Sequence, residues 1–147
     1  MSPSTIFEIA NTTALLAWLL LIIVPNFAGT KWVVRSGVVS LCFALAYAWF
    51  LLGNFSLDME GFEAFSTLEG IMALNGAPEL ALAGWLHYLA FDLMIGIWEV
   101  GNAQKHGLPH WLIIPALFFT FMLGPTGLLL YFITRSIYLR KLVLTVD

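Results

Sequence analysis

Charged residues are scarce in this sequence, and their scarcity excludes an ordinary soluble domain. Only 10% of the 147 residues are Asp, Glu, Lys or Arg, whereas about 25% is usual in soluble proteins. Hydrophobic residues make up 61% of the chain, and the mean hydropathy is +0.91. Because the apolar residues form long runs, the composition indicates a lipid bilayer as the solvent. We therefore expect a single transmembrane domain over residues 1–147.

Cysteine and clusters of basic residues are also nearly absent. Cys42 is the single cysteine, which excludes an intrachain disulfide and a zinc site built from cysteines. We expect Cys42 to be a small buried hydrophobic residue. The net charge is −3 and no run of Lys or Arg occurs, so nucleic acid is not an expected partner. Motifs for zinc hydrolysis, phosphate binding or a nucleophile elbow are missing, and no metal ligand is assigned.

Long apolar blocks organise the chain. A helix of about 20 residues crosses a hydrocarbon core of about 30 Å, and four blocks have this length: residues 5–24, 32–52, 80–100 and 111–134. The first block has no preceding Lys or Arg, so we expect a retained membrane helix rather than a signal peptide. Lipid offers no hydrogen bonds to the backbone, so the sequence predicts an all-α bundle of four transmembrane helices.

Two segments depart from straight spans. Between the second and third blocks, acidic residues and glycines interrupt a helical spacing of apolar residues, which predicts a short amphipathic interfacial helix. Those apolar residues are Phe62, Phe65, Leu68, Ile71 and Met72. In the fourth block, Pro115 and Pro125 each lack an amide donor, which predicts a kinked span. Such backbone is tolerated in a membrane only where protein or a cavity covers it.

Four spans would divide the basic residues equally between the two sides of the membrane. One side would carry Lys31, Arg35 and Lys105, and the other Arg135, Arg140 and Lys141. The early charges favour a cytoplasmic first loop, with both termini outside. The expected location is a multi-pass position in a bacterial inner membrane or a plastid membrane.

The third block carries ionisable residues in an apolar run, GWLHYLAFDLMIGIWE over residues 84–99. A charge at the centre of a membrane helix costs about 2.5–3.5 kcal/mol, so such residues indicate a functional site. Apolar surroundings favour the neutral forms of His87 and Asp92, and neutral groups of this kind can exchange protons. A hydrogen-bonded structural role for His87 remains the alternative interpretation.

Helix geometry limits how these groups can cooperate. At about 100° per residue, Asp92 and Glu99 lie within about 20° of each other, whereas His87 and Asp92 diverge by about 140°. A tight His87–Asp92 pair on one straight helix is therefore excluded, and each residue needs a partner from another helix. Candidate partners are Glu8, Asn11, Arg35 and Thr120. We expect Arg35 and Glu99 to form an ion pair, and Glu8, Asn11, Arg35 and Glu99 to be structural.

Two segments carry a family resemblance. AGWLHYLAFDLMIG at 83–96 and HGLPHWLIIPALFFTFMLGPTGLLLYFITR at 106–135 resemble the ABA4-like (abscisic acid-deficient 4) family, whose plant members act in neoxanthin formation. The spacing W-x-H-x-x-x-x-D-x-x-x-G, followed by P-H and G-P-x-G, is fairly specific in combination. The intervening link VGNAQKHG at 100–107 departs from the family pattern of an acidic residue and arginines. A link at this position could gate access to the bundle, so the resemblance does not fix the identity of the substrate.

The resemblance implies a role in carotenoid or xanthophyll metabolism, with isomerisation of a polyene lipid as the expected reaction. Opening a xanthophyll epoxide to an allene requires an acid and a base, and the resemblance implies Asp92 as the acid or proton carrier and His87 as the base or orienting partner. The residues expected to bind the substrate are Tyr88, Phe91, Gly96, Trp98, His110, Pro125 and Tyr131. The expected partners are membrane lipid and a carotenoid-like molecule. A small bundle with buried polar groups also suggests pairing with a second copy of the chain or with other subunits of a membrane pigment–protein complex.

Two other functions remain open from the sequence. The first is a non-catalytic pigment-binding or assembly subunit of a larger photosynthetic membrane complex. In that case His87 would be the axial ligand of a chlorophyll or haem, because neutral imidazole is a common metal ligand. The second is a proton or solute carrier that uses Asp92 and Glu99 on one helix face, although the chain lacks the inverted repeats of many transporters.

Overall fold

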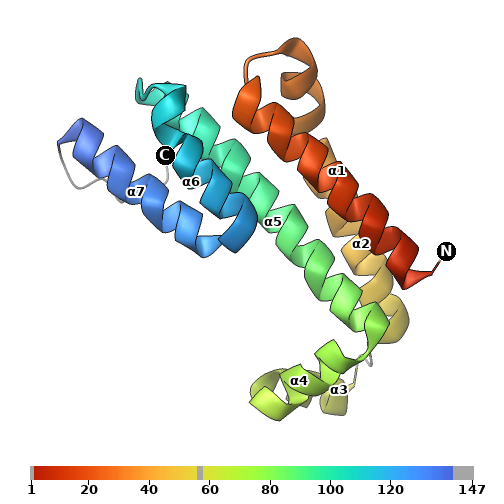
Figure 1. Cartoon of the computed structure of the whole chain (residues 1–147). Coiled ribbons are helices and arrows are strands. Elements are labelled where there is room, and N and C mark those ends of the chain that lie inside the picture. Colours follow the sequence, from red (N-terminus) through yellow and green to blue (C-terminus); the bar gives the residue numbers. More distant parts are fainter. Residues whose placement is uncertain (1, 56–57, 141–147) are drawn as a thin grey trace.

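The computed structural model describes residues 2–55 and 58–140, and every regular element in this part of the chain is helical (Figure 1). This confirms the expected all-α class. The N-terminal half contains α1 (Pro3–Ile23), the π-helix η1 (Thr30–Val34) and α2 (Val38–Asn54). Three short elements follow, namely α3 (Met59–Glu63), the 3₁₀-helix η2 (Ala64–Ser66) and α4 (Leu68–Gly76). The C-terminal half contains α5 (Pro78–Lys105), α6 (His110–Leu123) and α7 (Pro125–Leu139).

Three helical segments are long and apolar enough to cross a membrane: α1, the segment Thr30–Asn54 that joins η1 to α2, and α5. Their bounds agree with the first three expected spans to within a few residues. The side chain of Ser2 accepts a hydrogen bond from the amide of Thr5 and caps α1, as N-cap residues do. Gly37, at φ +81°, separates η1 from α2, and glycine tolerates this left-handed conformation without strain.

The fourth expected span is two helices rather than one kinked helix. Gly124 has φ 49° and ψ −103° and ends α6, and Pro125 is the first residue of α7. Proline suits this position because its missing amide would have no partner in the first turn of a helix. The two helices fold back on each other as a hairpin beside α5 (Figure 1). With 14 and 15 residues, they measure only about 21 and 22 Å at about 1.5 Å per residue.

The predicted interfacial helix between the second and third spans is likewise two short helices, α3 and α4, joined through η2. Thr67 has extended backbone and its side chain accepts a hydrogen bond from the amide of Gly70, so a new helix begins after it. The ring of Phe55, at the end of α2, packs against those of Phe62 and Phe65 at centroid distances of 5.8 and 5.3 Å. These contacts hold the short helices at one end of the bundle (Figure 1).

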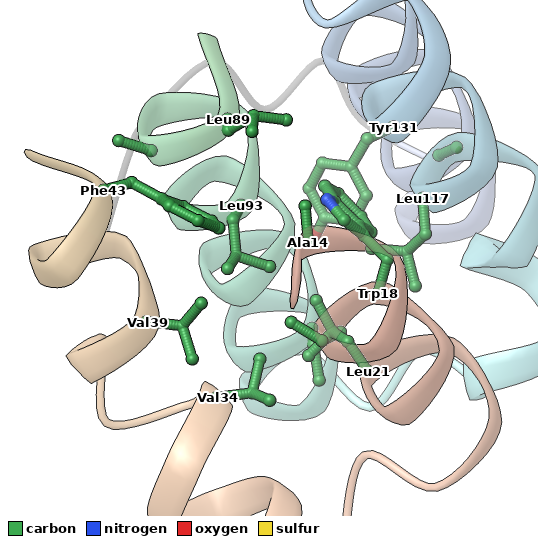
Figure 2. Packing of buried hydrophobic residues seen from close by; sticks show 14 of the residues in the cluster. Ala14, Trp18, Leu21, Val34, Val39, Phe43, Leu89, Leu93, Leu117 and Tyr131 are labelled. Carbon is green, nitrogen blue, oxygen red and sulfur yellow. The ribbon is translucent and has the colours of Figure 1, made fainter. Parts of the chain in front are cut away.

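The core lies between α1, α2, α5 and the hairpin. The indole of Trp18 extends from α1 toward Tyr131 and Leu117 of the hairpin (Figure 2). Gly96 allows this approach, because a Cβ atom there would meet Trp18 Cζ3 at 2.7 Å. Gly96, expected in substrate binding, thus lies in the core. Cys42, expected to be buried, is exposed on the outer face of α2, where acyl chains rather than protein would supply its apolar surroundings.

The tight crossing of α6 and α7 predicts the effect of adding one methyl group. A Cβ atom at Gly127 would overlap the backbone nitrogen of Thr120, so Gly127→Ala should destabilise the protein in detergent by about 1–3 kcal/mol, the usual range for overpacking. Thermal unfolding followed by tryptophan fluorescence measures the change. Gly101→Ala is the control, because nothing lies within 4 Å of its added Cβ. Equal unfolding temperatures for the two variants would contradict the close crossing.

Candidate functional site

A groove of about 540 Å³ lies between α1, the middle of α5 and the turn of the hairpin. We call it the Asp92 groove. Its walls are mainly apolar and aromatic, and its polar side chains come from Asn11, Trp85, Tyr88 and Asp92. Grooves of this size and character are typical of small-molecule sites, where a few polar groups orient an otherwise apolar ligand.

Asp92 is half-buried in this groove, beneath the turn of the hairpin. A Cβ atom at Gly124 would lie 2.9 Å from Asp92 Oδ1, so only glycine lets the backbone approach the carboxyl this closely. Gly124 therefore meets two demands, its positive φ and its contact with Asp92. Pro125, expected to bind the substrate, follows Gly124 and lines the same groove.

A second polar contact lies on the α1 side of the groove. Trp85 Nε1 donates a hydrogen bond of 2.7 Å to Asn11 Oδ1, and the indole also packs against Phe7 at 5.6 Å. This hydrogen bond links α1 to α5 and fixes an aromatic wall of the groove. Glu8, on the same helix, is exposed.

His87 lies in a different groove, of about 270 Å³, between α2, α4 and α5. Its imidazole is exposed and is flanked by the rings of Phe91 at 4.6 Å and Tyr47 at 5.5 Å. The expectation that His87 and Asp92 do not form a tight pair is confirmed. Tyr88 lines both grooves, so its exposed ring lies between the groove of His87 and the groove of Asp92.

Glu99 is fully buried and belongs to the interface between α5 and the hairpin. Thr120 Oγ1 lies 3.0 and 3.1 Å from its two carboxylate oxygens and donates the hydrogen bond. The expected ion pair between Arg35 and Glu99 is wrong, because the Arg35 guanidinium donates to Gln104 Oε1 at 2.9 Å. Gln104 lies five residues after Glu99, so Arg35 contacts the C-terminal end of α5 rather than its buried face. Asp92 and Glu99 share one face of α5, as their spacing predicted, and this face meets the hairpin.

Two further contacts, one buried and one partly buried, join α5 and its following link to α7. Tyr131 Oη donates to Asn102 Oδ1 at 2.7 Å, and Arg135 Nη2 lies 3.0 Å from His106 Nε2. Tyr131 and Arg135 are fully buried. Asn102 and His106, which belong to the 100–107 segment that departs from the family pattern, thus contact α7 of the hairpin. Sequence reasoning gave Arg135 no such role, although its four-residue spacing from Tyr131 places both on one helix face.

The remaining expected ligand contacts are divided between surface and interior. His110 Nε2 lies 2.7 Å from the carbonyl oxygen of Ile22 and joins the start of α6 to the end of α1. Trp98 is half-buried and packs against Tyr131 at 5.3 Å. Phe91 is exposed beside His87. Within residues 2–55 and 58–140, no group of three or more His, Cys, Asp or Glu side chains is placed to hold a metal ion.

The structure thus defines a class of small all-helical protein with three helices long and apolar enough to cross a membrane. The chain belongs to the ABA4-like family: the sequence model of this family, described as ABA DEFICIENT 4-like, matches residues 5–131. No curated protein and no solved structure matched the chain. The matched range includes both grooves and most of the hairpin.

The buried Glu99 predicts a specific sensitivity at Thr120. Thr120→Val keeps the side-chain shape but removes the hydroxyl that donates to the Glu99 carboxylate. An unsatisfied buried acceptor costs about 1–3 kcal/mol, so the variant should unfold at a lower temperature in detergent. Thr120→Ser, which keeps the hydroxyl, is the matched control and should lose less stability. Wild-type stability of Thr120→Val would show that the contact contributes little.

Proposed function

We propose that this chain is an integral membrane protein that binds a carotenoid-like polyene lipid in the Asp92 groove and isomerises it. The observation that carries the proposal is the position of Asp92, a half-buried carboxyl near the middle of an apolar helix and in a groove of about 540 Å³. Carboxyl groups at membrane depth are rare and generally functional. Membership of the ABA4-like family supports the choice of ligand class.

The groove suits one end of such a lipid. Its volume of about 540 Å³ would hold an end group, and the polyene would extend over the exposed rings of Tyr88 and Phe91. Asp92, Asn11 and Tyr88 would supply the polar contacts to an oxygen on that end group. A ligand of this kind would enter from the bilayer, where it is dissolved.

Acid–base isomerisation would follow from this placement. Asp92 in its acid form would protonate an epoxide oxygen, and the carbon–oxygen bond would break to give a hydroxyl group. Loss of a proton from the adjacent polyene carbon would complete the allene, so no net change of atoms or electrons occurs. His87 lies in the other groove, on the far side of Tyr88. It would accept this proton only if the ligand extends from the Asp92 groove across the ring of Tyr88.

Removal of the acid at position 92 tests the catalytic part of the proposal. Asp92→Asn keeps the shape of the side chain, so the variant should retain the bound lipid but lose product by a factor of about 10²–10⁴, the usual contribution of general acid–base catalysis. Pigment profiles of lipid extracts from expressing cells, separated by chromatography and read by mass spectrometry, measure the loss. Glu8→Gln, at an exposed carboxylate outside the groove, is the control. An unchanged pigment profile for Asp92→Asn would remove Asp92 as the acid.

A non-catalytic pigment-binding subunit is the second candidate, and the exposure of His87 favours it. An exposed imidazole between aromatic rings could serve as an axial ligand, since neutral imidazole commonly binds metals. The groove beside it is only about 270 Å³, so a tetrapyrrole would lie largely outside this chain, against a partner subunit.

Substitution of His87 separates the two candidates. In the isomerase, His87→Ala should lower product formation while the co-purified polyene stays. In the pigment-binding subunit, His87→Ala should instead remove a stoichiometric tetrapyrrole absorption band from the purified protein. Asn75→Ala, at a polar side chain lining the same groove, controls for general damage. If neither the pigment profile nor the spectrum changes, His87 belongs to neither function.

A further inference from the structure

The open end of the α6–α7 hairpin lies at one end of α5. Tyr138 Oη, in the last turn of α7, donates to the carbonyl oxygen of Gly107 at 3.2 Å. One turn earlier, Arg135 lies beside His106. The end of α7 therefore returns to the link between α5 and α6, instead of reaching the far end of the bundle (Figure 1).

The turn of the hairpin reaches about half the length of α5. Gly124 contacts Asp92, which lies near the middle of that helix. Each hairpin helix measures about 21–22 Å at about 1.5 Å per residue, which is too short for a hydrocarbon core of about 30 Å. Gly124 is buried in protein and lines the Asp92 groove, which is the setting in which non-helical backbone is tolerated at membrane depth.

This fold gathers the basic residues at a single end. The described Lys and Arg residues lie in or directly after η1, at the end of α5 and at the end of α7: Lys31, Arg35, Lys105, Arg135 and Arg140. The opposite end carries acidic residues just before and in α3, in α4 and at the start of α5: Asp58, Glu63, Glu69 and Glu79. The contact between Arg35 and Gln104 ties the first two basic regions together. Lys141 lies outside the described residues.

Charge and geometry therefore point to the same arrangement. We propose that the chain crosses the membrane three times, that α6–α7 is a re-entrant hairpin, and that its basic end faces the cytoplasm or stroma against anionic lipid headgroups. Cytoplasmic loops carry an excess of Lys and Arg, and the anionic lipids of that leaflet attract basic residues near the surface. The N-terminus and α3–α4 then lie on the opposite side. This inference rests on the membrane embedding in the proposed function but not on the polyene or its chemistry.

Single-cysteine labelling tests the arrangement in the full chain. In a Cys42→Ala background expressed in a bacterial host, Ser4→Cys and Ser66→Cys place thiols at the acidic end, and Ala28→Cys and Arg140→Cys place them at the basic end. All four positions are exposed and outside both grooves. A membrane-impermeant maleimide should label the first two variants in intact cells after outer-membrane permeabilisation. The last two variants should stay unlabelled until detergent opens the inner membrane.

Each alternative pattern overturns a stated part of the proposal. Labelling of Arg140→Cys together with Ser66→Cys in intact cells would mean that α6–α7 crosses the membrane, and it would overturn the re-entrant hairpin. Labelling of Ala28→Cys and Arg140→Cys, with protection of the other two, would overturn the orientation. Equal labelling of all four variants in detergent shows that each thiol is reactive. The pattern does not depend on isomerase activity, so a negative pigment assay leaves it intact.

Discussion

The contact of the α6–α7 hairpin with α5 is the constraint on which the rest of the structure depends. A chain that breaks a helix among apolar residues must cover the broken backbone, because lipid supplies no hydrogen-bond partners. Here α5 provides the cover with Asp92 beneath the turn and Glu99 bonded to Thr120 farther along. The half-buried position of Asp92 and the shape of its groove both follow from this docking.

The polar residues of α5 thereby divide into two groups with different physical roles. Glu99 is fully enclosed and its carboxylate accepts a hydrogen bond from Thr120, so it stabilises the position of the hairpin and is not open to a ligand. Asp92 lies in a groove of about 540 Å³, where an apolar molecule can reach it. The two residues share a helix face and looked equivalent in the sequence. In the structure Glu99 lies at the enclosed end of that face and Asp92 at its accessible middle.

The short hairpin also changes how charge is distributed. One turn at Gly124 brings Arg135 back to the end of the bundle that holds Arg35 and Lys105. Four full spans would have separated these residues and left the bundle without a dominant basic end. Local backbone geometry at a single glycine thus determines a property of the whole molecule, namely which of its ends is electrostatically suited to an anionic surface.

Periodicity and composition determined the all-helical fold, the bounds of three long helices and the divergence of His87 from Asp92, because these depend on local backbone geometry and residue type. The family was indicated separately, by the resemblance of short motifs around His87, Asp92 and Pro125. The same information predicted a kink where the chain reverses. The sequence around Pro125 is compatible both with the interior of a kinked helix and with the first turn of a new helix. Only the backbone conformation of Gly124 in the structure distinguishes the two. The partner of Arg35, the exposure of Cys42 and the burial of Arg135 were decided by tertiary packing. Each depends on which helices become neighbours, and in so uniformly apolar a chain the hydrophobic pattern distinguishes lipid from protein contact only weakly.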